Sequence, residues 1–75
     1  MSVARTTEIN ALSPESFEAA INEGLERAKQ TLRQVREAWI KDQIIMLDED
    51  GSVAGYQVRM VITFVLEESG GGAAI

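Results

Sequence analysis

The stretch from Ser13 to Val35, SPESFEAAINEGLERAKQTLRQV, decides the fold of this chain. Apolar and small residues recur in it at steps of three and four: Phe17, Ala20, Ile21, Gly24, Leu25, Ala28, Leu32 and Val35. This spacing predicts an amphipathic α-helix whose stripe faces a core. We expect Ser13 to cap the helix and Pro14 to be its first residue. On the polar side, Glu23 and Arg27 are spaced for an ion pair. A helix of about 20 residues is roughly 30 Å long and needs a broad apolar surface to cover its stripe.

Three other segments have the patterns of β-strands. Val3 to Ala11 is β-branched but polar, which predicts a strand at the edge of a sheet. Ala38 to Leu47 and Val53 to Glu67 predict two strands, joined at Asp48-Glu49-Asp50-Gly51 by a turn in which Gly51 takes positive φ. The even residues of the last strand are all apolar and should cover the helix: Ala54, Tyr56, Val58, Met60, Ile62, Phe64 and Leu66. The order β-α-β-β predicts an α+β fold with a three-stranded antiparallel sheet on one long helix.

The odd-numbered face of the same strand is half apolar, and this predicts self-association. It carries Val61 and Val65, and the preceding strand adds Trp39, Ile45 and Leu47 if its even residues point inward. A monomer would leave that surface exposed. A chain of 75 residues also has a small core, and without cysteine it has no disulfide to reinforce it. We therefore expect a homo-oligomer.

Composition narrows the function classes. The net charge of −5 argues against nucleic-acid binding, and no apolar run is long enough to span a membrane, which favours a cytoplasmic protein. Without His or Cys, and with no carboxylate pair in a recognisable pocket, we do not expect an enzyme. The acidic turn resembles half a calcium loop but lacks the full ligand spacing, so we interpret it as a hairpin turn and predict no metal site. We expect one domain, residues 1–68, and a flexible tail, residues 69–75.

Several motifs in this order resemble the dodecin family of small flavin-binding shells. Ser13-Pro14-Glu15-Ser16-Phe17 followed by Ala19-Ala20-Ile21 is similar to the family's helix entry, and Arg27-Ala28 to its mid-helix pair. Asp50-Gly51-Ser52-Val53-Ala54, Tyr56-Gln57-Val58 and Phe64-Val65-Leu66-Glu67-Glu68 resemble its hairpin, third strand and ending. The resemblance covers roughly residues 3–69. It implies a subunit of a hollow homododecamer that binds flavin, riboflavin or FMN, between subunits.

The resemblance also implies candidate flavin-binding residues. In flavin-binding members a Trp early in the second strand stacks on the ring, and a Gln in the third strand pairs with its polar edge. Gln57 is at the place of that Gln, whereas the place of the Trp is taken by Glu37. Trp39, the single Trp of the chain, lies two residues later, which keeps the same face of a strand but moves the side chain by about 7 Å. Val65 replaces an Arg that many bacterial members have, which removes a contact for the FMN phosphate.

Two hypotheses follow. In the first, the chain sequesters flavin, with Trp39 stacked on the ring and Gln57 hydrogen-bonded to it. In the second, the chain builds a dodecin-like shell without flavin, in which Trp39 packs against a neighbouring subunit and Gln57 bonds its own twin or water. An ion or another small ligand would then sit on a symmetry axis. Ala38-Trp39-Ile40-Lys41-Asp42-Gln43 resembles the second strand of dodecin-like members that lack the stacking Trp and bind no flavin.

Overall fold

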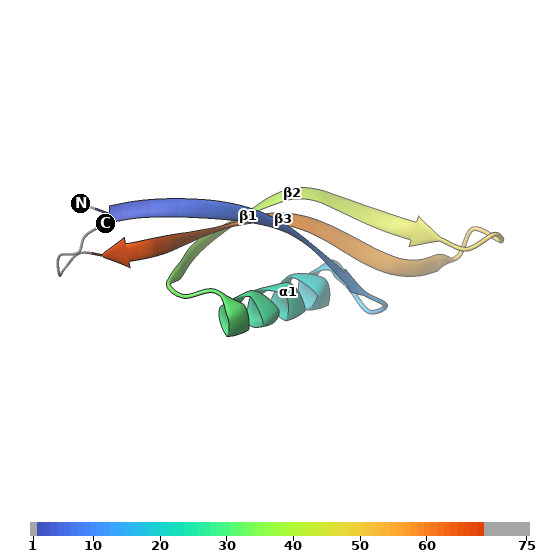
Figure 1. Ribbon diagram of the computed structural model, residues 1–75. Helices are drawn as coiled ribbons and strands as arrows, with labels where there is room; N and C mark the ends of the chain where they lie inside the picture. The colour runs from blue at the N-terminus through green and yellow to red at the C-terminus, as the bar shows by residue number, and fades with distance from the viewer. Residues whose placement is uncertain (1, 69–75) are drawn as a thin grey trace.

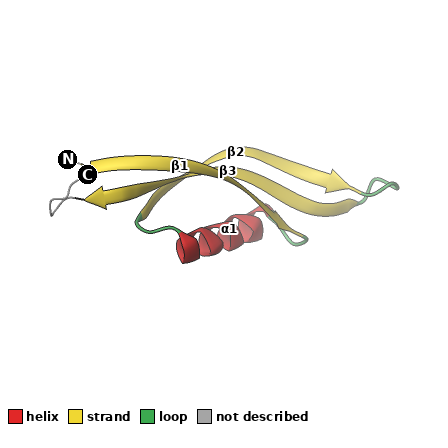
Figure 2. Cartoon of the chain, viewed as in Figure 1, coloured by secondary structure: helices red, strands yellow, loops and turns green. Residues whose placement is uncertain are grey.

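The computed structural model of the chain describes residues 2–68 and confirms the predicted β-α-β-β order. Strand β1 spans Ser2–Ser13, helix α1 Phe17–Thr31, strand β2 Val35–Leu47 and strand β3 Val53–Glu68. The three strands form one antiparallel sheet, and α1 lies against one face of it (Figure 1; Figure 2). The fold is α+β, as predicted. The tail predicted at residues 69–75 lies outside the described residues.

The strand order in the sheet is β1-β3-β2, so the last strand of the chain occupies the middle. The predicted edge position of the first strand is confirmed. β1 pairs with β3 as far as Ser13 opposite Tyr56, whereas β2 pairs with β3 from Val35 opposite Phe64 to Leu47 opposite Val53. The two outer strands are therefore staggered. One end of the sheet consists of β1 and β3 alone, and the other consists of β2 and β3 alone.

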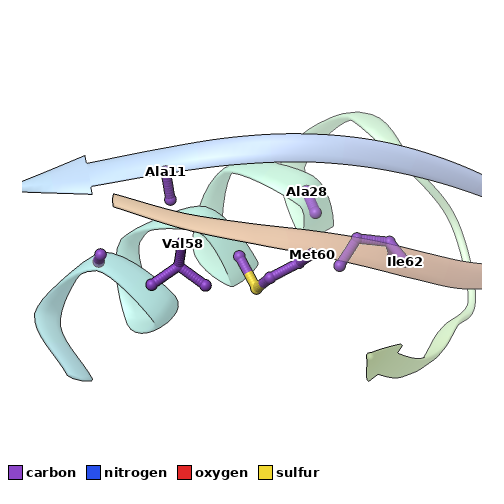
Figure 3. Close-up of a cluster of buried hydrophobic side chains, with 6 residues drawn as sticks. Ala11, Ala28, Val58, Met60 and Ile62 are labelled. Atoms are coloured by element: carbon purple, nitrogen blue, oxygen red, sulfur yellow. The ribbon is translucent and has the colours of Figure 1, made fainter. Parts of the chain in front are cut away.

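The core lies between the middle of β3 and the small residues of α1. Val58, Met60 and Ile62 are fully buried, and their side chains extend from β3 among Ala11 and Ala28 (Figure 3). Even-numbered residues in the middle of β3 thus cover the helix, as their alternation predicts, whereas Ala54 and Leu66 at its ends are exposed. Small residues on the helix allow α1 to lie close to the sheet. A Cβ at Gly24 would be only 3.0 Å from the Ala11 Cβ.

The described chain is long and thin. Its extents are 57 × 18 × 13 Å and its radius of gyration is 15.7 Å, against about 11 Å for a compact domain of this length. The 15-residue helix is about 22 Å long, whereas the 16 residues of β3 extend over roughly 50 Å. The helix therefore covers less than half of the sheet. Within residues 2–68 no helix is long and apolar enough to cross a membrane.

The helix begins three residues later than the sequence predicts. Ser13 remains in the sheet opposite Tyr56 and is buried, while its Oγ accepts a hydrogen bond from the Glu15 backbone N–H at 3.0 Å. The N-cap is Ser16, whose Oγ accepts from the Ala19 backbone N–H at 2.9 Å. Predicting Ser13 as the cap was wrong because strand pairing holds that residue in extended backbone. Pro14 lies in the loop rather than in the helix.

The helix also ends earlier, at Thr31 rather than at Val35. Leu32 is the C-cap, with extended backbone, and its N–H donates to the Ala28 carbonyl at 2.8 Å. Gln34 then takes a φ of 52°, which turns the chain into β2. Val35 pairs with Phe64 and belongs to the sheet. The predicted ion pair between Glu23 and Arg27 does not form. The two ion pairs found within residues 2–68, Lys41–Glu8 and Arg59–Asp42, are both on the sheet.

A bulge in β2 changes which side chains face the helix. Trp39 is opposite Val61 and Ile40 opposite Met60, but Asp42 is then opposite Arg59, so Lys41 is an extra residue. Residues directly opposite each other in a sheet share a face, so the alternation reverses after Lys41. Ile45, opposite Tyr56, therefore lies on the helix face, and its predicted place on the opposite face was wrong. A second irregularity follows Met46, after which Leu47 lies opposite Val53 on the face that was predicted for it.

The turn between β2 and β3 has the predicted form. Gly51 has a φ of 88°, and its N–H donates to the Asp48 carbonyl at 2.9 Å. The Asp50 Oδ1 accepts from both the backbone N–H and the Oγ of Ser52, at 3.0 and 2.6 Å. These bonds lower the pKa of the Asp50 carboxyl below its ordinary value, the Ser52 hydroxyl contributing most. The carboxylate thus stabilises the hairpin turn.

Candidate ligand-binding site

The sheet has an open face, defined here as the face that points away from α1. Figure 1 shows the single helix on the opposite side, and among residues 2–68 no element lies over the open face. Trp39 is on this face because its neighbour across the sheet is Val61, an odd-numbered residue of β3. Its side chain is 64% exposed. A chain that leaves an indole this exposed has a surface suited to a flat ligand or to a protein partner.

Glu37 shares the open face with Trp39. It lies opposite Thr63, two residues along β3 from Val61. The sequence argument that a two-residue shift keeps the face is therefore confirmed, and the separation along the strand is about 7 Å. Glu37 is exposed to solvent. A carboxyl group thus shares the open face with the indole, and a ligand or partner that covered it would have to remove its water.

Gln57 also lies on the open face, between Leu12 of β1 and Ile44 of β2. It is half-buried, and its Nε2 donates a hydrogen bond to the Asn10 Oδ1 at 3.3 Å. In this arrangement the Gln57 side-chain nitrogen faces Asn10. The side-chain oxygen of Gln57 and the second N–H of its amide remain for a ligand that offers a donor and an acceptor side by side.

Within one chain, Trp39 and Gln57 do not meet. Val61, which lies opposite Trp39, is four residues from Gln57 along β3, a distance of about 13 Å between Cα atoms. The Arg59–Asp42 ion pair, with 3.4 Å between Nη1 and Oδ2, lies between them. One subunit thus presents the two candidate residues at separate places on one face.

A second ion pair lies close to Trp39. The Lys41 Nζ is 3.4 Å from the Glu8 Oε1, although the two residues belong to the two outer strands. Glu8 and Trp39 both lie opposite Val61, from β1 and β2 respectively, so the pair passes over the middle strand beside the indole. Both pairs are partly exposed and contribute little to stability. Their effect is to order the polar groups of the open face.

The end of the open face beyond Glu37 offers no cation from β3. Val65 lies opposite Ala4 of β1, so apolar side chains occupy the place where the resemblance implies a basic contact. The acidic turn lies at the other end of the sheet. Within the described chain no three acidic side chains are grouped closely enough to hold a metal ion, and the Asp50 carboxylate is occupied by Ser52.

A second feature, which the sequence patterns do not indicate, is a groove between β1 and α1. It has a volume of about 600 Å³ and runs along the edge of β1 that pairs with no strand of residues 2–68. Its lining includes Ile9 and Ala11 of β1 and Arg27 and Ala28 of α1, with Leu32 beyond the end of the helix. Only the strand order reveals it, because that order leaves β1 with a free edge beside the helix.

Comparisons with known proteins identify the family of this chain. A family model described as Dodecin matches residues 3–67. The chain belongs to the dodecin family. Among curated proteins no match was found. The dodecin from Streptomyces davaonensis is similar in structure, with a TM-score of 0.82 and 34% identity over 89% of this chain and 97% of that one.

Two further solved structures of dodecins are similar to this chain. A point variant of the T. thermophilus dodecin has a TM-score of 0.81 and 37% identity, covering 91% of this chain and 100% of that one. A calcium dodecin from Mycobacterium tuberculosis, described as having a calcium-binding site, has a TM-score of 0.75 and 25% identity, covering 97% and 100%. Dodecins of similar fold thus include a protein described as binding calcium.

Proposed function

We propose that this dodecin is a flavin-binding protein rather than an enzyme, and that it holds riboflavin or FMN between the subunits of a closed homododecameric shell. The observation that carries the proposal is Trp39, an indole that is 64% exposed on the open face. An aromatic side chain gains area burial and stacking energy when a flat ring covers it. Family membership supports the ligand class, because flavin binding is the function that the resemblance implies.

Shape supports the self-association. A radius of gyration of 15.7 Å describes a subunit that is extended rather than compact. Large apolar side chains are at least 44% exposed at both ends of the sheet and along it: Val3, Leu12, Trp39, Ile45, Leu47, Val53 and Leu66. Contacts between copies bury such side chains and compensate for the small core of one subunit. The hollow dodecamer is the assembly that family membership favours.

The distance between the candidate residues favours an inter-subunit site. Because Trp39 and Gln57 are about 13 Å apart along one open face, we assign the indole that stacks on a flavin and the amide that pairs with its edge to different subunits. Gln57 is prepared for this role, since its bond to Asn10 leaves the amide oxygen for the ring's N–H.

Glu37 and Val65 set the preference between flavins. The Glu37 carboxylate lies about 7 Å from Trp39 on the same face and repels an anionic phosphate nearby. Val65 offers the phosphate no counter-charge. We therefore expect riboflavin to bind at least as tightly as FMN, and Glu37→Gln to improve FMN more than riboflavin.

The test is a titration of ligand-free protein into riboflavin, followed by flavin emission. We expect the emission to be quenched, because a stacked indole quenches an excited flavin. Trp39→Ala should weaken binding at least tenfold, through the loss of about 0.5–1.5 kcal/mol of stacking and of the buried area. Gln57→Leu should also weaken it, because the ring's polar edge would be buried without partners. Asn22→Ala, on the exposed side of α1, is the control. Unquenched emission at tens of micromolar protein would refute flavin binding.

The alternative is a dodecin shell without flavin, and Glu37 is the observation that favours it. A ring stacked near Glu37 would remove water from a carboxylate without giving it a donor. In that shell Trp39 packs against a neighbouring subunit, and an ion or another small ligand occupies an axis. Calorimetric titration with calcium separates the two: heat with Ca²⁺ and none with riboflavin supports the alternative.

A further inference from the structure

The open face around Trp39 has a chemistry of its own, which uses the same indole as the proposed function but does not depend on flavin binding. Trp39 is the most exposed of the large apolar side chains that the structure describes, at 64%. Among natural side chains an indole offers the most favourable π face to a cation. A planar ring that covers Trp39 extends over the neighbouring side chains, so these neighbours decide which kind of ring is favoured.

The neighbours of the indole come from two successive rungs of the sheet. The register is regular here, and residues opposite each other on a rung share the open face. We call these two rungs the Trp39 patch, which consists of Glu8, Val61 and Trp39 on one rung and Thr6, Thr63 and Glu37 on the next. The middle of the patch, from β3, is uncharged and half-buried. The two acidic residues are at diagonal corners, because Glu37 is about 7 Å from Trp39 along β2 and Glu8 is about 10 Å from it across two strand spacings.

The two acidic corners of the patch differ in their ion pairs. The Glu8 Oε1 is 3.4 Å from the Lys41 Nζ, so the amine closest to the indole is held at that corner. Glu37 is exposed and makes no ion pair within residues 2–68. The patch thus combines an exposed indole with an acidic side chain that no cation of the described chain neutralises.

We propose that the Trp39 patch binds a planar aromatic cation, such as an N-alkylated heteroaromatic ring. The ring lies on the indole, and its positive charge lies near Glu37. A neutral ring at this place removes water from Glu37 without compensation, and an anionic ring adds repulsion, whereas a cation attracts the acidic group. A cationic ring therefore agrees with two observations that have opposite consequences for flavin, the exposed indole and the acidic residue beside it. The net charge of −5 also draws cations toward the protein.

Two probes of nearly the same shape test the proposal. N-methylacridinium carries a fixed positive charge, whereas acridine is uncharged at neutral pH. Trp39 is the single Trp of the chain, so quenching of its emission reports binding at the patch, and calorimetry gives the affinities. We expect N-methylacridinium to bind at least tenfold more tightly than acridine. Equal affinities, or an unchanged Trp39 emission with both probes, would overturn the proposal.

Variants that change one charge show whether the preference is local. Glu37→Gln keeps the size of the side chain and should remove most of the preference for N-methylacridinium, while the affinity for acridine does not fall. Glu18→Gln is the matched control, since it changes the net charge equally from an exposed position on α1, on the other side of the sheet. Lys41→Gln should strengthen binding of the cation, because it releases Glu8. Equal losses in Glu37→Gln and Glu18→Gln would assign the preference to the net charge and refute the patch.

A parallel titration with riboflavin separates this proposal from the proposed function. Binding of N-methylacridinium without binding of riboflavin upholds the patch and refutes flavin binding. Binding of riboflavin without any preference for the cationic probe has the opposite meaning. When both bind, riboflavin should displace N-methylacridinium, because both cover Trp39. Independent binding of the two would place the cation elsewhere on the protein and contradict the proposal.

Discussion

Replacing Gly24 should test the close approach of α1 to the sheet. A Cβ at this position would be 2.5 Å from the Met60 Cε, 3.0 Å from the Ala11 Cβ and 3.5 Å from the Ile9 Cδ1. The first distance requires the Met60 side chain to move, and the second requires the backbones to separate slightly. Overpacking of this kind costs about 1–3 kcal/mol, whereas Gly→Ala in a helix gains about 1 kcal/mol. We expect Gly24→Ala to destabilise the protein by about 1 kcal/mol.

The contact with Met60 provides a sharper test. Leucine has no Cε, so Met60→Leu removes the atom closest to the new methyl group. Gly24→Ala should therefore cost at least 0.5 kcal/mol less in the Met60→Leu background, a coupling within the range of about 0.5–3 kcal/mol for residues in contact. Urea denaturation of the four proteins at one fixed concentration gives this coupling energy, since unfolding of an oligomer depends on concentration.

A matched control separates packing from helix propensity. Asn22→Ala lies on the exposed side of α1 and should stabilise the helix slightly, because alanine has the higher propensity there. If Gly24→Ala stabilised the protein as Asn22→Ala does, the helix would lie further from the sheet than the structure places it. Additive effects of Gly24→Ala and Met60→Leu would contradict the contact itself.

Three further predictions concern the core, the hairpin turn and the exposed Ile45 of β2. Leu25→Ala should cost about 2 kcal/mol by chemical denaturation, at the low end for a leucine because this side chain is only half-buried, and Ile62→Ala should cost more because Ile62 is fully buried. The NMR titration midpoint of Asp50 should lie below the ordinary value of 3.8 and should rise in Ser52→Ala. The stabilisation of the turn by Asp50 is complete above that ordinary value and is lost as pH falls through the lower folded-state pKa. Ile45→Lys should weaken subunit association without unfolding the subunit, because Ile45 is already half-exposed in its own chain; unfolding by circular dichroism would show that it belongs to the subunit core.

Periodicity predicts which elements exist, but hydrogen bonds decide where they end. The stripe from Phe17 to Leu32 can belong only to a helix, because no strand places such residues on one side. Ser13 and Ser16 are both good caps in the sequence, and nothing local distinguishes them. Ser16 is the cap because Ser13 pairs with Tyr56 in the sheet, which is a contact between residues far apart in the chain. The extent of the helix could not be predicted without the register of the strands.

The candidate site could be predicted to the same degree. The sequence indicates on which face of the sheet each candidate residue lies, but not which residues lie next to it. Alternation places Trp39 and Glu37 on the open face, since both precede the bulge, and the pairing with Val61 and Thr63 confirms it. Past Lys41 the alternation fails, because one extra residue exchanges the faces and the sequence has no signal for it. The hydrogen bond between Gln57 and Asn10 depends on the register of β3 against β1. The sequence shows only that each strand carries a polar residue, and not that the two meet.

The mismatch in length between the helix and the sheet explains why this sequence carries more apolar residues than its core uses. The helix can cover roughly 22 Å of a strand that extends over about 50 Å. Residues beyond the helix, such as Ile45 and Val53, still follow strand patterns, but no part of the described chain covers them. A sequence adapted to a monomer would place polar side chains there. Apolar side chains at these positions support the proposed assembly, in which other subunits would cover the sheet and complete the core. In the proposed assembly the same division accounts for the exposure of Trp39 in one chain, because the proposed site forms where two chains meet.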